Sequence, residues 1–100
     1  DVWAPAILSP KSGDVWASGQ TQNVTWDLSS QPAQITNNNG FILLRSSGAG
    51  TPVVLAHDFL LTDGSVEITV PDVLTRDDYG ITLFGDSGDI VDGITINGVV

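Results

Sequence analysis

Apolar and polar residues alternate strictly along residues 23–28. Such alternation predicts a half-buried β-strand, because successive side chains of a strand point to opposite faces. Val24, Trp26 and Leu28 are therefore expected to face the core. Asn23 and Thr25 face outward, and Asn23-Val24-Thr25 is an N-glycosylation sequon. This stretch predicts the largest core residue and, at Asn23, a glycan acceptor typical of secreted proteins.

Further strands are predicted at regular intervals along the chain. Residues 65–70 alternate as cleanly and direct Val66, Ile68 and Val70 into the core. Shorter extended or apolar runs, bounded by turn-forming residues, are predicted strands at residues 1–7, 14–16, 41–45, 52–58, 79–84 and 90–96. Seven or eight short strands, with turns about every 8–12 residues, are typical of an antiparallel β-sandwich. We predict one domain over residues 1–100, an all-β sandwich of the immunoglobulin or fibronectin III type.

Tyr79 supports this fold class. It begins the penultimate predicted strand directly after polar turn residues, which is the position of the tyrosine corner in such sandwiches. A disulfide-bonded immunoglobulin domain would carry a cysteine two residues later, where this chain has Ile81. The sequence contains no cysteine, so Ile81 and Trp26 are expected to fill the space of the bridge. Core packing alone must then hold the fold together.

The predicted strand at residues 41–45 carries large apolar residues on both faces. If Arg45 faces solvent, Phe41 and Leu43 share its side, while Ile42 and Leu44 enter the core. An outward Phe41 and Leu43 would form a patch that suits a subunit or partner interface, including a homodimer. The alternative is that the loop at residues 59–61 folds over this patch. The inward side of residues 52–58 is not settled, because residues 53–55 are all apolar.

The charge of the chain narrows its possible partners. Twelve acidic and three basic side chains give a net charge of −9. This field repels nucleic acid and anionic membrane surfaces, so neither is an expected partner. No apolar run approaches the ~18 residues of a membrane-spanning helix, so insertion of this chain into a bilayer is not expected.

Three aspartates are weak candidates for a metal site. Asp86, Asp89 and Asp92 lie near one end of the predicted sandwich, and loop aspartates can supply the oxygen ligands that Ca²⁺ requires. A calcium-binding extracellular module is therefore one alternative function. The spacing does not match an EF-hand loop, and acidic turns more often serve solubility. We expect no metal and no cofactor.

The sequence offers little for catalysis. His57 is the only histidine, and no Gly-x-Ser-x-Gly motif surrounds a serine. One imidazole without cysteine or methionine does not make an ordinary transition-metal site. A glycosidase would need paired carboxylates, one of them in an apolar cleft that small sandwiches lack. The chain is expected not to be an enzyme.

Exposed tryptophans on a flat β-face can stack on sugar rings, which makes each tryptophan a candidate for ligand contact. The alternation places Trp26 in the core, and Trp16 in its short strand is also more often a core residue. Trp3 lies on the predicted N-terminal edge strand. Trp3 is therefore the main candidate for ligand contact and Trp16 the second.

The order and spacing of these residues resemble a known family. The pattern P-x2-G-x2-W-x2-G-x4-V-x-W is formed by Pro10, Gly13, Trp16, Gly19, Val24 and Trp26. Further along stand Ile42-x-Leu44, Val54-Leu55-Ala56, Asp63-Gly64-Ser65, Val70-Pro71 and Asp78-Tyr79-x-Ile81. From Pro10 to Ile96 the chain resembles the N-terminal domain of the fungal yeast cell wall synthesis proteins, also called the Ser/Thr-rich GPI-anchored membrane family.

This resemblance implies a secreted or wall-associated fungal protein with an immunoglobulin-like fold. Some members of the family are linked to assembly of cell-wall β-1,6-glucan, and the family has no catalytic motif to transfer to this chain. The implied function is to bind or organise wall β-glucan, and a self-associating structural domain is the alternative. Members often continue into a Ser/Thr-rich stalk and a lipid-anchor signal, so any anchor is expected in a longer precursor.

Overall fold

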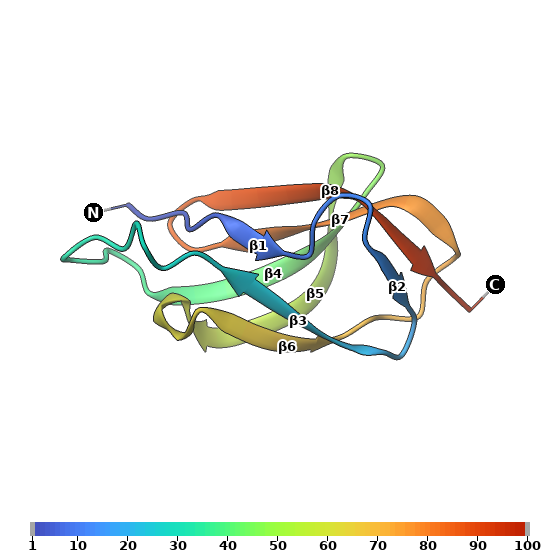
Figure 1. The fold of residues 1–100 in the computed structure, drawn as a ribbon, viewed down its shortest axis with the longest axis horizontal. Helices are drawn as coiled ribbons and strands as arrows, with labels where there is room; N and C mark the ends of the chain where they lie inside the picture. The colour runs from blue at the N-terminus through green and yellow to red at the C-terminus, as the bar shows by residue number, and fades with distance from the viewer. Residues whose placement is uncertain (1, 100) are drawn as a thin grey trace.

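The computed structural model describes residues 2–99 and folds them into two β-sheets that pack face to face (Figure 1). The elements are β1 (Ile7–Ser9), β2 (Val15–Ala17), β3 (Thr21–Trp26), β4 (Asn39–Ser46), β5 (Ala49–Leu60), the 3-10 turn η1 (Leu61–Asp63), β6 (Ser65–Thr69), β7 (Arg76–Phe84) and β8 (Gly88–Asn97). One sheet has the strand order β1-β3-β6, and the other has the order β2-β8-β7-β4-β5. Paired strands are antiparallel except β2 and β8, which are parallel. The all-β sandwich predicted from the sequence is confirmed.

A hydrophobic core fills the space between the sheets. Trp26 is 3% exposed, and its ring centroid lies 5.5 Å from that of Phe59. Its indole N–H donates a 2.6 Å hydrogen bond to the Leu61 carbonyl. Ile81 on the facing sheet is fully buried, so both residues lie in the core as predicted. Each such side chain contributes about 1.5–3 kcal/mol through burial, which a sandwich without cysteine depends on.

The tyrosine corner is present. Tyr79 on β7 is buried, and its hydroxyl donates a 2.7 Å hydrogen bond to the backbone carbonyl of Leu74. The bond ties the segment between β6 and β7 to the strand that follows it. Tyr79 therefore has the role predicted from its position in the sequence.

The N-terminal part of the chain belongs to both sheets. β1 pairs with β3 in the three-stranded sheet, and β2 pairs with β8 in the five-stranded sheet. Between them the chain crosses the open edge of the sandwich at the cis peptide bond Ser9–Pro10. Hydrogen bonds from the Gly13 N–H to the Gly93 carbonyl and from the Ser18 N–H to the Asn97 carbonyl hold the second part of this segment against β8.

The sides of β4 are as predicted. Ile42 and Leu44 are buried in the core, whereas Phe41 is 40% exposed on the outer face of the sheet, with Leu43 half-buried beside it. The loop at residues 59–61 does not cover Phe41, because it turns the other way: Phe59 and Leu61 are themselves core residues. The covering-loop alternative is therefore wrong, and the apolar outer face of β4 remains open.

The prediction that Leu28 faces the core is wrong. This residue was expected to continue the inward series of Val24 and Trp26, but β3 ends at Trp26 and Leu28 is exposed. The Asp27 carboxylate accepts a 2.8 Å hydrogen bond from the Ser29 N–H, which turns the backbone out of the sheet. Leu28 then packs near the turn at Gly64 instead of in the core.

Candidate functional site

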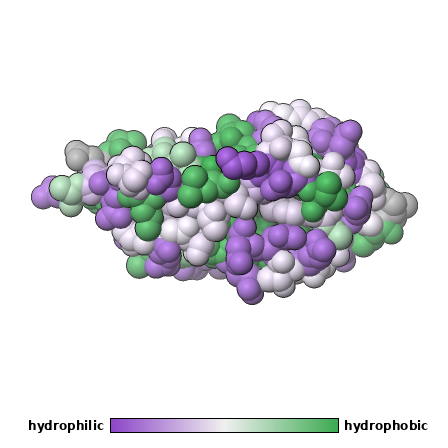
Figure 2. All heavy atoms as spheres, in the orientation of Figure 1, coloured by the Kyte–Doolittle hydropathy of each residue, from purple (hydrophilic) through white to green (hydrophobic). Residues whose placement is uncertain are grey.

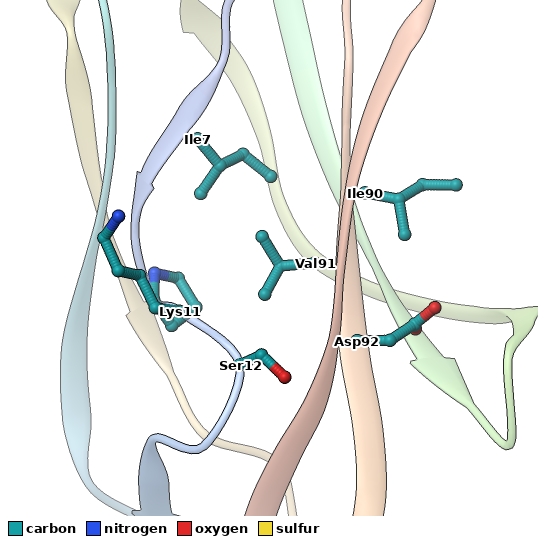
Figure 3. A pocket seen from close by; sticks show the side chains of 7 residues that line it. Ile7, Lys11, Ser12, Ile90, Val91 and Asp92 are labelled. Atoms are coloured by element: carbon teal, nitrogen blue, oxygen red, sulfur yellow. The ribbon is translucent and has the colours of Figure 1, made fainter.

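A groove opens where the N-terminal segment crosses the edge of the sandwich (Figure 3). Its volume is about 550 Å³. Its lining residues come from β1, from the connection to β2 and from β8: Ile7, Pro10, Lys11, Ser12, Ile90, Val91 and Asp92. None of these residues was singled out as a ligand contact from the sequence, apart from Asp92 as a weak metal candidate.

The groove exists because β8 is longer than its neighbour. β2 pairs with β8 only along Thr95–Asn97 in the described chain, while β8 begins at Gly88. The earlier part of β8 faces β1, which belongs to the other sheet. At this point the Ile7 N–H donates a 2.9 Å hydrogen bond to the Asp89 carboxylate, which joins the two sheets at one end of the groove.

The groove has an apolar floor and a polar rim. Figure 3 shows the side chains of Ile7 and Val91 pointing toward one another across the groove. Ser12 lies further along the segment that carries Ile7, and the Lys11 side chain extends from this segment away from Val91. Ile90 and Asp92 point away from the groove, on the other side of β8. An apolar floor with a few hydrogen-bonding groups is the usual composition of a site for an organic ligand.

The prediction that Trp3 and Trp16 contact a ligand is wrong. Both side chains are only 4% exposed, so neither presents a ring face to a ligand at the surface. The Trp3 indole N–H donates a 3.3 Å hydrogen bond to the Ser30 hydroxyl. Burial in residues 2–7 alternates, with Trp3, Pro5 and Ile7 inward, and this alternation of large and small residues was the signal in the sequence.

The three aspartates that were weak metal candidates do not form a common site, because two of them have other partners. The Asp89 carboxylate accepts the Ile7 N–H, and Asp92 forms an ion pair with Arg45, with 2.9 Å between Oδ1 and Nε. Asp86 lies exposed in the turn between β7 and β8. Among residues 2–99 there is no group of three or more histidines, cysteines or acidic residues arranged to hold a metal ion.

A second surface of interest is the outer face of the five-stranded sheet. Cross-strand neighbours on β5, β4, β7 and β8 place five apolar side chains on this surface, which we call the apolar face: Phe41, Leu43, Val54, Phe84 and Ile90. The Phe41 and Phe84 rings are stacked, with 4.7 Å between centroids and 14° between planes. The sequence analysis identified Phe41 and Leu43 but not their neighbours, because strand pairing could not be assigned.

An ion-pair network borders one end of the apolar face. The Arg76 guanidinium lies 2.6 Å from the Asp78 carboxylate, and both contact the Ser47 hydroxyl at 2.7 Å. The hydrogen bond from Ser47, followed by that from Arg76, lowers the pKa of Asp78 below its usual range. The same partnership raises the pKa of Arg76, mainly through the hydrogen bond to Asp78.

Asn23 lies on the opposite side of the molecule. It is exposed on β3, the middle strand of the three-stranded sheet, and pairs across to Glu67. Its outward neighbours are small or polar: Thr21, Thr25, Ser65, Glu67 and Thr69. The three-stranded sheet lies toward the viewer in Figure 1, and the same view in Figure 2 shows hydrophilic residues across this face, with apolar ones scattered among them.

The sequence matches one known protein family. Residues 9–92 match the Kre9/KNH-like N-terminal Ig-like domain. The chain belongs to this family. The family is linked to yeast cell wall β-glucan synthesis, which indicates the fungal cell wall as the setting of the Kre9/KNH-like domain described here. No curated protein and no solved structure gave a significant match.

The matched region contains both surfaces. It includes every groove residue except Ile7 and all five residues of the apolar face. Within residues 2–99 the structure has no helix with the length and apolarity needed to cross a bilayer.

Proposed function

We propose that this Kre9/KNH-like domain is a non-catalytic, secreted cell-wall protein that binds β-glucan in the groove beside β8. The observation that carries the proposal is the groove itself, with Ile7 and Val91 on its floor and Lys11 and Ser12 on its rim. Sugars present both apolar C–H surfaces and hydroxyl groups, and such a lining can contact both. β-Glucan is uncharged, so the net charge of −9 does not oppose its approach.

The extracellular location is supported by two features. The Asn23 sequon is exposed on the outer face of the three-stranded sheet, where a glycan meets no steric obstacle from the pairing strands. The family match connects the chain with cell-wall synthesis. The proposal that the domain is not an enzyme rests on the way its polar groups are used: Asp89 and Asp92 are engaged by Ile7 and Arg45.

The test is retention of the purified domain on particulate β-1,3-glucan and on β-1,6-glucan, with cellulose as an unrelated polysaccharide. Ser12→Trp fills the groove, and Lys11→Ala shortens a side chain that lines it. Ser65→Trp is the matched control, because Ser65 is exposed on the outer face of the other sheet. We expect retention of the wild type and of Ser65→Trp, with clear loss for Ser12→Trp and a partial loss for Lys11→Ala.

Two results would overturn the proposal. The first is no retention of the wild-type domain on either wall glucan. The second is equal retention of Ser12→Trp and Ser65→Trp, which would place binding outside the groove. Accumulation of new reducing ends during incubation with glucan, at a rate that tracks the domain through purification, would contradict the non-catalytic part.

A further inference from the structure

The apolar face forms a continuous surface over four neighbouring strands. Register places Phe41 beside Phe84 and His57 in one row, and Leu43 beside Thr82 and Val54 in the next. Ile90 on β8 completes the second row, since it pairs with Thr82. Phe41, Val54 and Ile90 are 40%, 51% and 50% exposed, so the apolar side chains at this surface are not covered by the described chain.

The two aromatic rings of the apolar face offer a sugar less ring surface than separate rings would, because they stack on each other. The 4.7 Å between the Phe41 and Phe84 centroids equals the usual spacing of neighbouring strands, and the ring planes are nearly parallel. The rings therefore cover one face of each other. A sugar ring stacks on an aromatic face, whereas an apolar protein surface packs against ring edges as well.

The apolar face carries few unpaired charges on a strongly acidic protein. Two of the three cations of the chain lie at this surface, and each is paired there with an aspartate: Arg45 with Asp92 and Arg76 with Asp78. Asp58, whose carboxylate lies 2.8 Å from His57 Nδ1, adds one acidic side chain beside the His57 end of the face. Two copies can therefore approach through this face with less repulsion than through other faces.

We propose that a second copy of this chain docks on the apolar face, across a two-fold axis that runs along the strands between β4 and β7. A two-fold interface requires a surface that complements itself. This axis brings Phe41 opposite Phe84, and Val54 opposite Ile90, in both halves of the interface. It also places the protruding His57 opposite Gly88, which has no side chain.

The outer face of the five-stranded sheet is large enough for such a dimer when the contact extends from the apolar face to the row of Arg45 and Asp92. β7 has nine residues, and four strands take part. At the usual strand rise and spacing the outer face of these four strands measures about 30 by 19 Å, or roughly 570 Å² on each copy, and the five apolar residues occupy two rows at one end of it. Two copies together bury more than the ~1,000 Å² expected of a specific interface. Ile90 belongs both to the apolar face and to the lining of the groove, whereas Ile7 and Val91 on the groove floor lie on the other side of β8.

The experiment is sedimentation velocity of the purified domain from about 1 µM to about 1 mM, at low and at high salt. We expect a concentration-dependent dimer that becomes tighter with salt, because salt screens repulsion between two acidic copies. Val54→Asp places a charge on the face and weakens association about tenfold or more. Leu8→Asp is the matched control, since Leu8 is an exposed residue of β1 in the other sheet.

Two oppositely charged variants test whether Val54 of one copy lies opposite Ile90 of the other. This test looks for a gain of association and not only for a loss. Val54→Asp and Ile90→Lys each place a charge in the proposed interface, so each variant alone is expected to self-associate about tenfold or more weakly than the wild type. Mixed together, they are expected to form a heterodimer, because the new aspartate of one copy lies opposite the new lysine of the other. A wild type that remains monomeric throughout overturns the proposal. Equal weakening by Leu8→Asp, or failure of the mixed variants to associate, overturns the assigned face and register.

Discussion

The guanidinium of Arg45 reaches the carboxylate of Asp92 across the backbone of Gly80. Arg45 lies on β4 and Asp92 on β8, and Gly80 is the residue of β7 that pairs with both of them. The ion pair, with 2.9 Å between Nε and Oδ1, therefore spans three strands. This is possible because Gly80 has no side chain: an added Cβ would meet the Val91 carbonyl and would lie 2.5 Å from Asp92 Oδ1.

Gly80→Ala is expected to destabilise the domain by about 1–3 kcal/mol, because the clash is with backbone and with a carboxylate already held by Arg45. Gly50→Ala is the matched control, since Gly50 pairs with Arg45 from the other side and a Cβ there meets nothing within 4 Å. The measurement is the free energy of unfolding in urea. Equal stability of the two variants would show that β8 moves to accept the methyl group.

Trp26→Phe is expected to cost more stability than Trp16→Phe, although both tryptophans are almost fully buried. Both changes remove core volume, but Trp26 also donates the 2.6 Å hydrogen bond to the Leu61 carbonyl. Without it this carbonyl keeps only the longer 3.3 Å bond from the Gly64 N–H. The difference between the variants is expected to be about 1–2 kcal/mol in urea unfolding. A larger loss for Trp16→Phe would contradict this ranking.

Acid is expected to weaken the network of Asp78, Arg76 and Ser47. The pKa of Asp78 is lowered in the folded state, so its stabilising effect is present above the unfolded value of 3.8 and is lost as pH falls through the folded pKa. Asp78→Asn should therefore lose less Tm than the wild type on acidification from about pH 6 to about pH 3. Asp72→Asn, in the exposed segment before β7, is the control and should follow the wild type. Parallel acid profiles of Asp78→Asn and the wild type would exclude the network as a source of pH dependence.

Secretion from a eukaryotic host is expected to add a glycan at Asn23. The product should lose mass on treatment with an N-glycosidase, and Asn23→Gln should abolish this shift, whereas Asn39→Gln should leave it unchanged. Because Asn23 and the apolar face lie on different sheets, glycosylated and unglycosylated protein should associate with the same affinity. A glycan that prevents association would place the interface on the three-stranded sheet.

Much of the fold followed from alternation because both sheets bury one face. The sides of β3, β4 and β6 were predicted correctly, since a one-residue shift would have exposed Val24, Ile42 or Ile68. β5 was not settled: it is an edge strand with irregular register against β4, so Val54 faces outward while Leu55 packs on the core. The local sequence of β5 does not specify which side of the strand faces the core, because apolar residues occupy both sides.

The errors at Trp3 and Leu28 have the same origin. Both lie beyond the end of a regular strand: burial alternates over residues 2–7 ahead of β1, whereas the predicted alternation stops after β3 ends at Trp26. Trp3 precedes β1 but is covered by the sandwich, and Leu28 follows β3 but is turned outward by the Asp27–Ser29 hydrogen bond. The groove was not predictable for a related reason: Ile7 and Val91 are distant in sequence and meet only because β1 and β8 belong to different sheets.

The parallel pairing of β2 with β8 determines how the domain responds to mechanical load. The two ends of the described chain point to opposite ends of the long axis (Figure 1). Tension applied between the segment before β1 and the segment after β8 pulls these parallel strands past one another along their length. The hydrogen bonds Gly13–Gly93, Asp14–Thr95 and Ser18–Asn97 are then loaded together in shear, and none can break alone as in a zipper. A sandwich without disulfide cross-links thereby gains resistance to stretching.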